Sequence, residues 1–290
     1  MRRALPHAAR TAHGFTLIET IMVIVIIGIL GAIVAVFIRA PVQAYADTVA
    51  RAEATDEADL ALRRMARDIR LALPNSVRVN ADGSAIEFLL TTTGGRYLAV
   101  EDEAAAGVPL SFTDATQLRF SVVGPLRAPV FPGDLVAVSN LGLPGADAYE
   151  GTTVSLVQDV EGAGTGMPTI TLAANRFAQQ PLPMPSPDAR FQVVRGALSY
   201  QCEPAPGGGF QLRRYANHDL RPALPVPPSG ARMTASVLAA RVAACAGIFR
   251  SEHLAARRGG LVVLALSLRT RNLADPAVRL VHQVHLDNTP

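Results

Sequence analysis

A long apolar run near the start of the chain limits what this sequence can fold into. Residues 21–38 contain no charged side chain. As a helix, these 18 residues would extend about 27 Å, close to the thickness of the hydrocarbon core of a bilayer. We therefore predict one membrane span.

The segment before this run is short and basic. Residues 1–14 carry Arg2, Arg3 and Arg10 and no acidic side chain. Because positively charged flanks stay on the cytoplasmic side, we expect the rest of the chain after Ile38 to cross the membrane.

A cleavable secretory signal is the alternative, since Ala44-Tyr45-Ala46 offers a small-residue cleavage site directly after the run. The apolar core of such a signal has about 7 to 15 residues and does not begin with a Glu. The length of the run and the position of Glu19 therefore favour a retained span over cleavage after Ala46.

The junction between the basic and apolar segments carries a specific motif. The hexapeptide from Gly14 to Glu19 reads Gly-Phe-Thr-Leu-Ile-Glu. Together with the apolar run, it resembles the signal of type IV prepilins and of type II secretion pseudopilins. The resemblance implies cleavage after Gly14 by a membrane-embedded prepilin peptidase and N-methylation of the new terminus at Phe15. It also implies that the span stays in the bacterial inner membrane, with a cytoplasmic N-terminus and a periplasmic head.

Glu19 lies at the edge of the apolar run, where packing does not explain a carboxylate. An ionised carboxylate near the apolar phase costs about 2.5 to 3.5 kcal/mol, so it should have a cationic partner. After cleavage the nearest cation is the amine of Phe15, on the same chain or on a neighbour. In the family that the motif resembles, this pairing guides a new subunit into register. The alternative is a Glu whose side chain snorkels to the lipid headgroups.

The overall charge does not indicate a nucleic-acid partner. The chain has 27 basic and 24 acidic residues, and its sequence pI is about 9.2. Three of the basic residues belong to the leader, so the chain without its leader has 24 of each and is formally neutral. No basic stripe interleaved with aromatic residues occurs, so nucleic-acid binding is not predicted.

Helical periodicity continues from Phe15 to Leu73, with Pro41 as an expected bend. In the outer part, apolar residues recur every three or four positions and can lie on a sheet. These residues are Ala58, Leu62, Met65, Ile69 and Leu73. Four arginines of the same stretch are expected to form the solvated face of the domain, and contacts with neighbouring subunits are the alternative. They are Arg63, Arg64, Arg67 and Arg70.

Beyond Pro74 the periodicity changes to two, which is typical of strands. Segments 77–79 and 85–90 flank an Asp-Gly turn and predict a hairpin. Further strands are predicted at residues 117–123, 134–139, 152–157, 168–172, 190–194, 210–215, 261–268 and 278–286. Segments 180–187 and 221–230, dense in Pro and Gly, predict loops.

These patterns predict an α+β fold of the pilin type, with a long N-terminal α-helix, transmembrane in its inner part, packed on a mostly antiparallel, β-rich C-terminal head. The predicted divisions are a cleaved leader at 1–14, the transmembrane and assembly half of the helix at 15–38, its periplasmic amphipathic half at 39–73, and the head domain at 74–290.

Cys202 and Cys245 both fall on the exported side, where thiols meet an oxidising compartment. A bridge between them would constrain the unfolded chain by about 4 kcal/mol in the chain-entropy model. Two buried thiols are the alternative. The chain has no C-x-x-C motif, so redox catalysis is not expected.

No catalytic, cofactor-binding or metal-binding residue is predicted, and the chain is not expected to be an enzyme. His282 and His285 would point to opposite faces of a strand. The glycine-rich segments 162–166 and 207–209 lack the features of a phosphate-binding loop and are interpreted as turns.

Four segments resemble minor pilins of the mannose-sensitive haemagglutinin (MSHA) pilus system, of the MshO type. They are residues 41–45, 61–70 with 73–78, 199–202 and 284–290. The resemblance implies a role in initiation or tip assembly of a pilus. The implied partners are other minor and major pilins, the inner-membrane assembly platform and membrane lipid. The alternatives are a minor pseudopilin of type II secretion, resembling the J component, and a membrane-tethered binding or sensory domain.

Overall fold

A computed structural model describes residues 14–102, 107–252, 259–270 and 276–287. The chain divides into two compact units, one that extends to Arg51 and one from Ala52 to Pro290. Most of the predicted leader lies outside the described residues.

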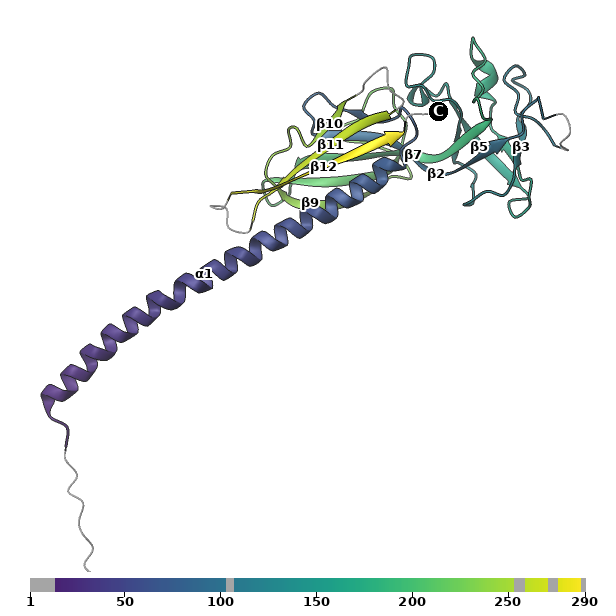
Figure 1. The fold of residues 1–290 in the computed structure, drawn as a ribbon. Coiled ribbons are helices and arrows are strands. Elements are labelled where there is room, and N and C mark those ends of the chain that lie inside the picture. Colours follow the sequence, from purple (N-terminus) through teal and green to yellow (C-terminus); the bar gives the residue numbers. More distant parts are fainter. Residues whose placement is uncertain (1–13, 103–106, 253–258, 271–275, 288–290) are drawn as a thin grey trace, which may run out of the picture. The chain divides into compact units, whose positions relative to one another are not determined.

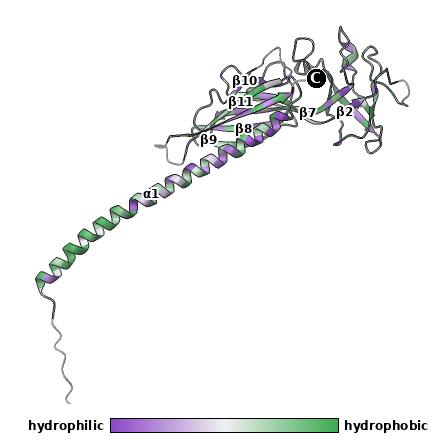
Figure 2. Cartoon of the chain, viewed as in Figure 1, coloured by the Kyte–Doolittle hydropathy of each residue, from purple (hydrophilic) through white to green (hydrophobic). Residues whose placement is uncertain are grey.

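The first element is α1, a helix from Leu17 to Arg70 that continues through Pro41. Its hydropathy changes along its length (Figure 2): the first part is hydrophobic and the later part is mixed. Residues 21–38 are all exposed, whereas the last turns carry a buried apolar face. The sequence pattern predicted this division within one helix.

The helix ends three residues before the predicted boundary at Leu73. The backbone there pairs with a strand instead of continuing the helix: Leu73 N donates to Leu89 O at 2.7 Å, and Ala72 forms a bridge with Leu90. The following Pro74 disfavours the helical conformation at the residue before it.

The described residues after the helix form twelve strands in one sheet, and the pairings between these strands are antiparallel. The strands are β1 (Arg78–Val79), β2 (Ala85–Tyr97), β3 (Arg119–Val123), β4 (Leu135–Ala137), β5 (Val154–Glu161), β6 (Thr169–Leu172), β7 (Arg190–Pro204), β8 (Phe210–His218), β9 (Thr234–Val242), β10 (Phe249–Glu252), β11 (Gly259–Leu268) and β12 (Val278–Asp287). Their order is β1-β2-β3-β6-β5-β4-β7-β8-β9-β11-β10, and β12 pairs with β11. The predicted α+β class, with a long helix and an antiparallel β-rich head, is confirmed.

One hydrophobic core joins the outer part of α1 to the sheet. Small and medium apolar side chains on one helix face, such as Ala58 and Met65, are fully buried with residues of β7, β8, β11 and β12. The alanines allow the helix to lie close to the strands. From the helix the core contains Ala54, Ala58, Ala61, Leu62, Met65, Ala66 and Ile69.

A second lobe is inserted between β2 and β7 and contains β3, β4, β5 and β6 (Figure 1). It has its own core, in which Phe120 and Phe191 meet edge to face with ring centroids 5.7 Å apart. The long strands β2 and β7 pair along their length, from Ala85 with Gln201 to Arg96 with Arg190, and so belong to both lobes.

The sequence patterns did not predict β9 and β10. The segment of β9 is rich in alanine, which disfavours strands. It becomes a strand by pairing with β8, for example Tyr215 with Ala235. The patterns also placed the end of β2 at Leu90, but the strand continues through Gly94, where a Cβ would come within 2.7 Å of Phe191 O.

Candidate processing and assembly site

The junction predicted to be processed lies at the very start of the described chain. Gly14 and Phe15 precede the helix, and 81% of the Phe15 surface is exposed. No described residue approaches within 4 Å of the position that a Gly14 Cβ would occupy. The peptide bond between Gly14 and Phe15 is therefore outside regular secondary structure, as cleavage by a peptidase requires.

Thr16 caps the first turn of α1. Its Oγ1 accepts a hydrogen bond from Glu19 N at 3.3 Å, and its carbonyl oxygen accepts from Thr20 N at 3.2 Å. The Thr-x-x-Glu spacing is that of a capping box, and an acidic residue in the first turn suits the helix dipole. Thr16 thus caps the backbone N–H of Glu19, a local contact that the Thr16–Glu19 spacing could have revealed and that the sequence interpretation missed.

The apolar segment of α1 has no partner within the described chain. It is the one candidate membrane span found among the described residues, and none of its most apolar window is buried. Side chains such as Ile24 and Phe37 are 65% and 75% exposed. A contiguous apolar surface of this size is stable only in lipid or against other apolar helices.

Two carboxylates attach the outer part of α1 to the sheet. Asp68 accepts from Tyr200 Oη at 2.6 Å and from Arg214 Nε at 2.9 Å. Glu57 accepts from the backbone of residue 240 at 2.6 Å and from Arg241 Nη2 at 3.0 Å. Such charge-assisted hydrogen bonds fix the rotation of the helix about its axis.

The opposite face of this helix segment is exposed. Arg64, Arg67 and Arg70 are exposed and have no ion pair among the described residues, whereas Arg63 pairs with Asp59 at 2.8 Å on the same helix. The face opposite the sheet is therefore available to another molecule.

A buried ion pair lies where the two lobes meet. Arg78 Nη2 is 2.9 Å from Glu87 Oε1, and the guanidinium stands 3.6 Å from the centroid of the Tyr149 ring. Burial raises the pKa of Glu87 to about 7, against the opposing effect of Arg78. Arg78 also donates to the carbonyls of Arg221 and Pro222, so this cluster ties several loops together. Its contacts are all internal, which indicates a structural role.

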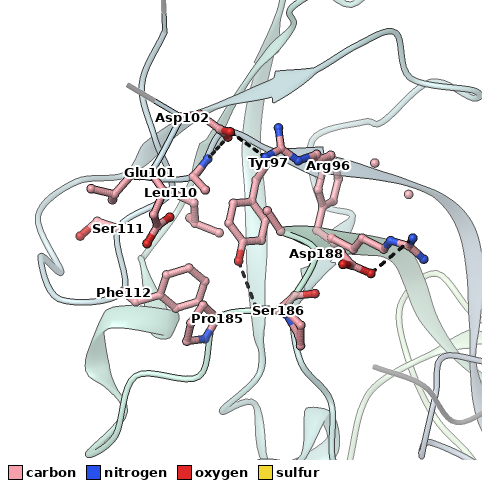
Figure 3. Close-up of a pocket in the computed structure, with 18 of the residues that line it drawn as sticks. Arg96, Tyr97, Glu101, Asp102, Leu110, Ser111, Phe112, Pro185, Ser186 and Asp188 are labelled. Atoms are coloured by element: carbon pink, nitrogen blue, oxygen red, sulfur yellow. Dashed lines mark hydrogen bonds and ion pairs between the residues drawn. The ribbon is translucent and has the colours of Figure 1, made fainter. Parts of the chain in front are cut away.

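An open pocket of about 1200 Å³ lies in the inserted lobe (Figure 3). Tyr97 and Phe112 approach each other there, with ring centroids 5.7 Å apart, and Tyr97 Oη accepts from Ser186 N at 3.1 Å. Arg96 pairs with Asp102 at 2.7 Å. Its described lining contains no His or Cys, and so no pairing of a nucleophile with a histidine base.

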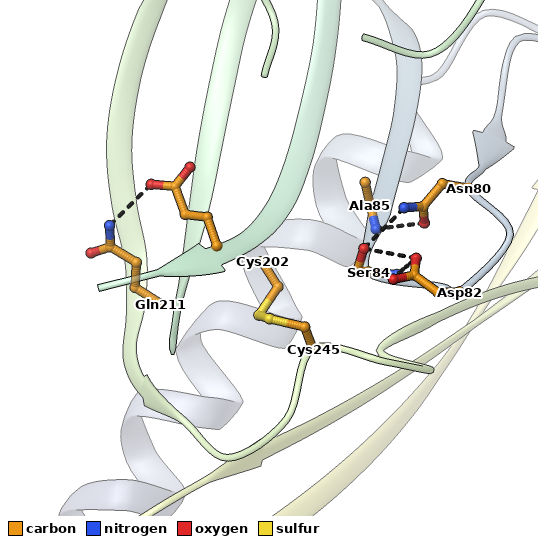
Figure 4. The surroundings of a disulfide bond; sticks show 8 residues. Asn80, Asp82, Ser84, Ala85, Cys202, Gln211 and Cys245 are labelled. Atoms are coloured by element: carbon orange, nitrogen blue, oxygen red, sulfur yellow. Dashed lines mark hydrogen bonds between the residues drawn. A yellow bond between two sulfur atoms is a disulfide. The ribbon is translucent and has the colours of Figure 1, made fainter. Parts of the chain in front are cut away.

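Cys202, at the end of β7, is bonded to Cys245 in the segment between β9 and β10, with Cα atoms 5.4 Å apart (Figure 4). The same region holds the β1–β2 turn, because Cys202 N donates to Ser84 O at 3.0 Å. In that turn, Gly83 has a φ of 70°, and a Cβ there would come within 2.5 Å of Phe249 O. The disulfide closes a ring that contains the loop predicted at residues 221–230.

The other motifs lie where turns or surface strands are expected. Residues 162–166 connect β5 with β6, and residues 207–209 connect β7 with β8. His282 and His285 are on β12, His282 partly buried and His285 exposed. Within the described ranges, no three His, Cys, Asp or Glu side chains are grouped so as to hold a metal ion.

Comparison with known proteins gives one finding at the N-terminus. The family described as the prokaryotic N-terminal methylation motif matches residues 9–35. This range includes the Gly14–Phe15 junction, Thr16, Glu19 and most of the apolar run. Comparison with curated proteins and with solved structures finds no significant match.

Proposed function

We propose that the chain is a minor pilin of an MSHA-type system that helps to initiate the pilus or form its tip. The proposal starts from the N-terminal methylation motif and the apolar helix, which support a type IV pilin-like or pseudopilin protein. The observation that carries the proposal is the accessible Gly14–Phe15 junction directly before an exposed apolar helix. Pilin-like proteins are structural, which agrees with the expectation that the chain is not an enzyme.

In this proposal, a prepilin peptidase cleaves after Gly14, and the new terminus at Phe15 is methylated. The span then remains in the inner membrane, with the cleaved end cytoplasmic and the head, residues 74–290, periplasmic. The inner-membrane assembly platform moves the helix from lipid into a bundle with other minor and major pilins. Glu19 pairs there with the amine of a Phe15.

The size of the head favours a place at the end of a filament. The second unit extends from Ala52 to Pro290 and includes an inserted lobe with a separate core. A repeating shaft brings identical subunits close together, and so large a head would be costly to accommodate at every position.

Mass spectrometry of the N-terminal peptide of the membrane-extracted protein tests the processing step. We expect a chain that begins at N-methylated Phe15. A chain that begins at Met1 would reject processing, and one that begins after Ala46 would show a secretory signal instead.

Replacement of the assembly carboxylate tests the helix bundle. The Glu19→Val protein should insert and be cleaved but should not enter filaments, while Glu19→Asp, which keeps the charge, should retain part of the assembly. Unchanged piliation of the valine variant would reject the proposed pairing.

The subunits that copurify with the protein distinguish the type of filament. Copurification of a major pilin supports the pilus. Copurification of type II secretion pseudopilins would instead support the J-like alternative. If no pilin-like subunit copurifies, the result would support a membrane-tethered binding or sensory domain.

A further inference from the structure

Another cavity of the head, distinct from the open pocket in the inserted lobe, has a volume of about 260 Å³. Its walls come from β4 and β5 of the inserted lobe, from β7 and β8, from the short 3-10 helix η2 (Arg176–Gln179) and from the segment before β9. We call this cavity the arginine pocket. It lies entirely within residues that the structure describes.

Three arginines from separate parts of the chain line the arginine pocket. They are Arg176 of η2, Arg195 of β7 and Arg232 before β9. Arg176 Nη1 donates to Gly151 O at 3.2 Å, and Arg232 Nη2 donates to Gly133 O at 2.7 Å. Because both acceptors are neutral carbonyls, these hydrogen bonds position the two guanidinium groups without neutralising their charge. Each guanidinium keeps further N–H donors for another acceptor.

The nearby acidic side chains do not balance this charge. Asp134 lies 3.5 Å from Arg195, and Asp219, which also lines the pocket, lies 3.8 Å from Arg221. Among the described residues, neither of the other two arginines has a carboxylate partner within 4.0 Å. The arginine pocket therefore keeps an excess of positive charge. Planar guanidinium groups are well suited to bind a carboxylate through paired hydrogen bonds.

The rest of the lining is apolar on one part and polar on another. Leu135 and Leu156 contribute apolar surface, and Leu156 is 45% exposed although it belongs to a strand of the inserted lobe. Asn217 and Asp219 contribute an amide and a carboxylate. Amide and carboxylate oxygens accept hydrogen bonds from hydroxyl groups. A bound molecule that used the whole lining would therefore carry a negative charge, a carbon skeleton and hydroxyl groups.

A buried histidine of the same lining points to the same chemistry. His218 is 1% exposed, and its Nδ1 lies 3.2 Å from Asp219 O. A carbonyl oxygen can only accept, so Nδ1 carries the proton of this hydrogen bond. Burial lowers the pKa of His218, which favours the neutral ring with Nε2 as an acceptor. Nε2 has no hydrogen-bond partner among the described residues, and a hydroxyl donor is the kind of group that it lacks.

We infer that the arginine pocket binds a small hydroxylated carboxylate, of the size of one sugar acid. The three arginines hold the carboxylate, Asn217 and Asp219 accept from hydroxyl groups, and Leu156 packs on the carbon skeleton. Pockets for drug-sized ligands have about 300 to 1,000 Å³, so a cavity of about 260 Å³ suits a smaller molecule. A bare sulfate or phosphate would leave the leucines without a contact.

Calorimetric titration of the full-length protein in detergent tests the inference. The probes are glucuronate and galacturonate, and the comparison ligands are glucose, which has no carboxylate, and inorganic sulfate, which has no carbon skeleton. We expect at least one of the two sugar acids to bind at least about 10-fold more tightly than glucose and sulfate, a difference of about 1.4 kcal/mol. If neither sugar acid binds, or if glucose binds equally well, the inference is overturned. Equal binding of sulfate would show a general anion site and would overturn the class of ligand.

Removal of two charges tests the role of the arginines. Arg176→Gln with Arg232→Gln should weaken binding of the sugar acid at least about 10-fold. Arg64→Gln with Arg67→Gln is the matched control, because these arginines of α1 are also exposed and have no ion pair among the described residues. The control should bind as the unaltered protein does. Equal losses in the two variants would show an effect of overall charge and would overturn the site.

Filling the cavity gives a second test that keeps all three arginines. Leu156→Trp places a larger side chain in the arginine pocket, at a position that is partly exposed and therefore tolerant of size. Binding of the sugar acid should be lost although the charge is unchanged. Circular dichroism checks that the variant is folded. Unchanged affinity in the folded variant would place the bound molecule elsewhere and overturn the inference.

These measurements do not depend on the proposed function. The arginine pocket is formed by the head alone, and the titrations require neither processing at Gly14 nor assembly of a filament. Absence of binding would therefore reject the ligand site and leave the proposed function intact, whereas an unprocessed N-terminus would count against the proposed function and leave the ligand site intact.

Discussion

The two parts of α1 are made from the same element but reach stability in different ways. Residues 52–70 bury alanines, Met65 and Ile69 against the sheet of their own chain. Residues 21–38 are more apolar and bury none of their side chains. The difference teaches that the amount of apolar surface does not decide whether a helix folds onto its own domain. What decides it is whether the helix also has a polar face opposite its apolar face.

The largest expected effect is on processing at Gly14, directly before the apolar part of α1. Gly14→Leu should leave nearly all of the protein as an unprocessed membrane precursor, because the motif resembles a site where a peptidase accepts a small residue. Immunoblotting of membranes for chain length measures this. Gly28→Leu is the matched control, since that glycine also has open space around it, and it should be processed normally. Normal processing of the Gly14 variant would count against peptidase recognition.

The second effect separates the buried and exposed faces of the outer part. Met65→Ala should lower the free energy of unfolding of the head by about 2 to 5 kcal/mol, because it leaves a cavity in the main core. Leu60→Ala on the exposed face should change it by less than about 0.5 kcal/mol. Denaturant unfolding of the full-length protein in detergent, followed by circular dichroism, compares them. Similar losses would contradict the assignment of the faces.

The third effect concerns the head alone. Replacing Cys202 and Cys245 together by serine should lower the free energy of unfolding by about 2 to 4 kcal/mol, because the closed ring no longer restricts the unfolded chain. Processing at Gly14 should not change, because the inner part does not depend on the head's stability for its contacts with lipid. Peptide mapping without reductant should recover one linked pair from the unaltered protein. Two alkylatable thiols in that protein would contradict the bridge.

The last effect is a pH dependence of the stability of the head. The pKa of Glu87 is raised from 4.5 to about 7 in the folded protein, so the folded state binds the proton more tightly. The contribution of Glu87 to stability is therefore full below pH 4.5 and is lost as the pH rises through 7.

The comparison is made with Glu87→Gln, which does not titrate. Relative to this variant, the unaltered protein should lose on the order of 3 kcal/mol of stability between pH 5 and pH 8. The neighbouring His218 has a pKa lowered by burial and acts in the opposite direction, but it is present in both proteins. Parallel pH profiles would show that Glu87 does not titrate in this range.

The sequence predicted the elements whose pattern is local. The apolar run, the amphipathic stripe of α1 and each predicted strand are present, because periodicity reflects which face of an element is buried. The fold class followed from these patterns.

Features that depend on distant residues were not predictable in this way. The Ala-rich strand β9 exists because β8 lies beside it, and the insertion of a second lobe between β2 and β7 leaves no local signal. Of the candidate site, residues 14–19 could be recognised because the motif is contiguous. The anchors Asp68 and Glu57 could not, since their partners are more than 100 positions away.

The insertion has a further consequence for how this protein can change. Its two ends are neighbours in the sheet, as the pairing of Arg96 with Arg190 shows, and its interior is largely its own. The pairing of β2 with β7 therefore holds the two ends of the insertion side by side. New loops or a different lobe could evolve between these strands, and so alter the surface that the inserted lobe presents, without rearranging the surfaces that hold the helix.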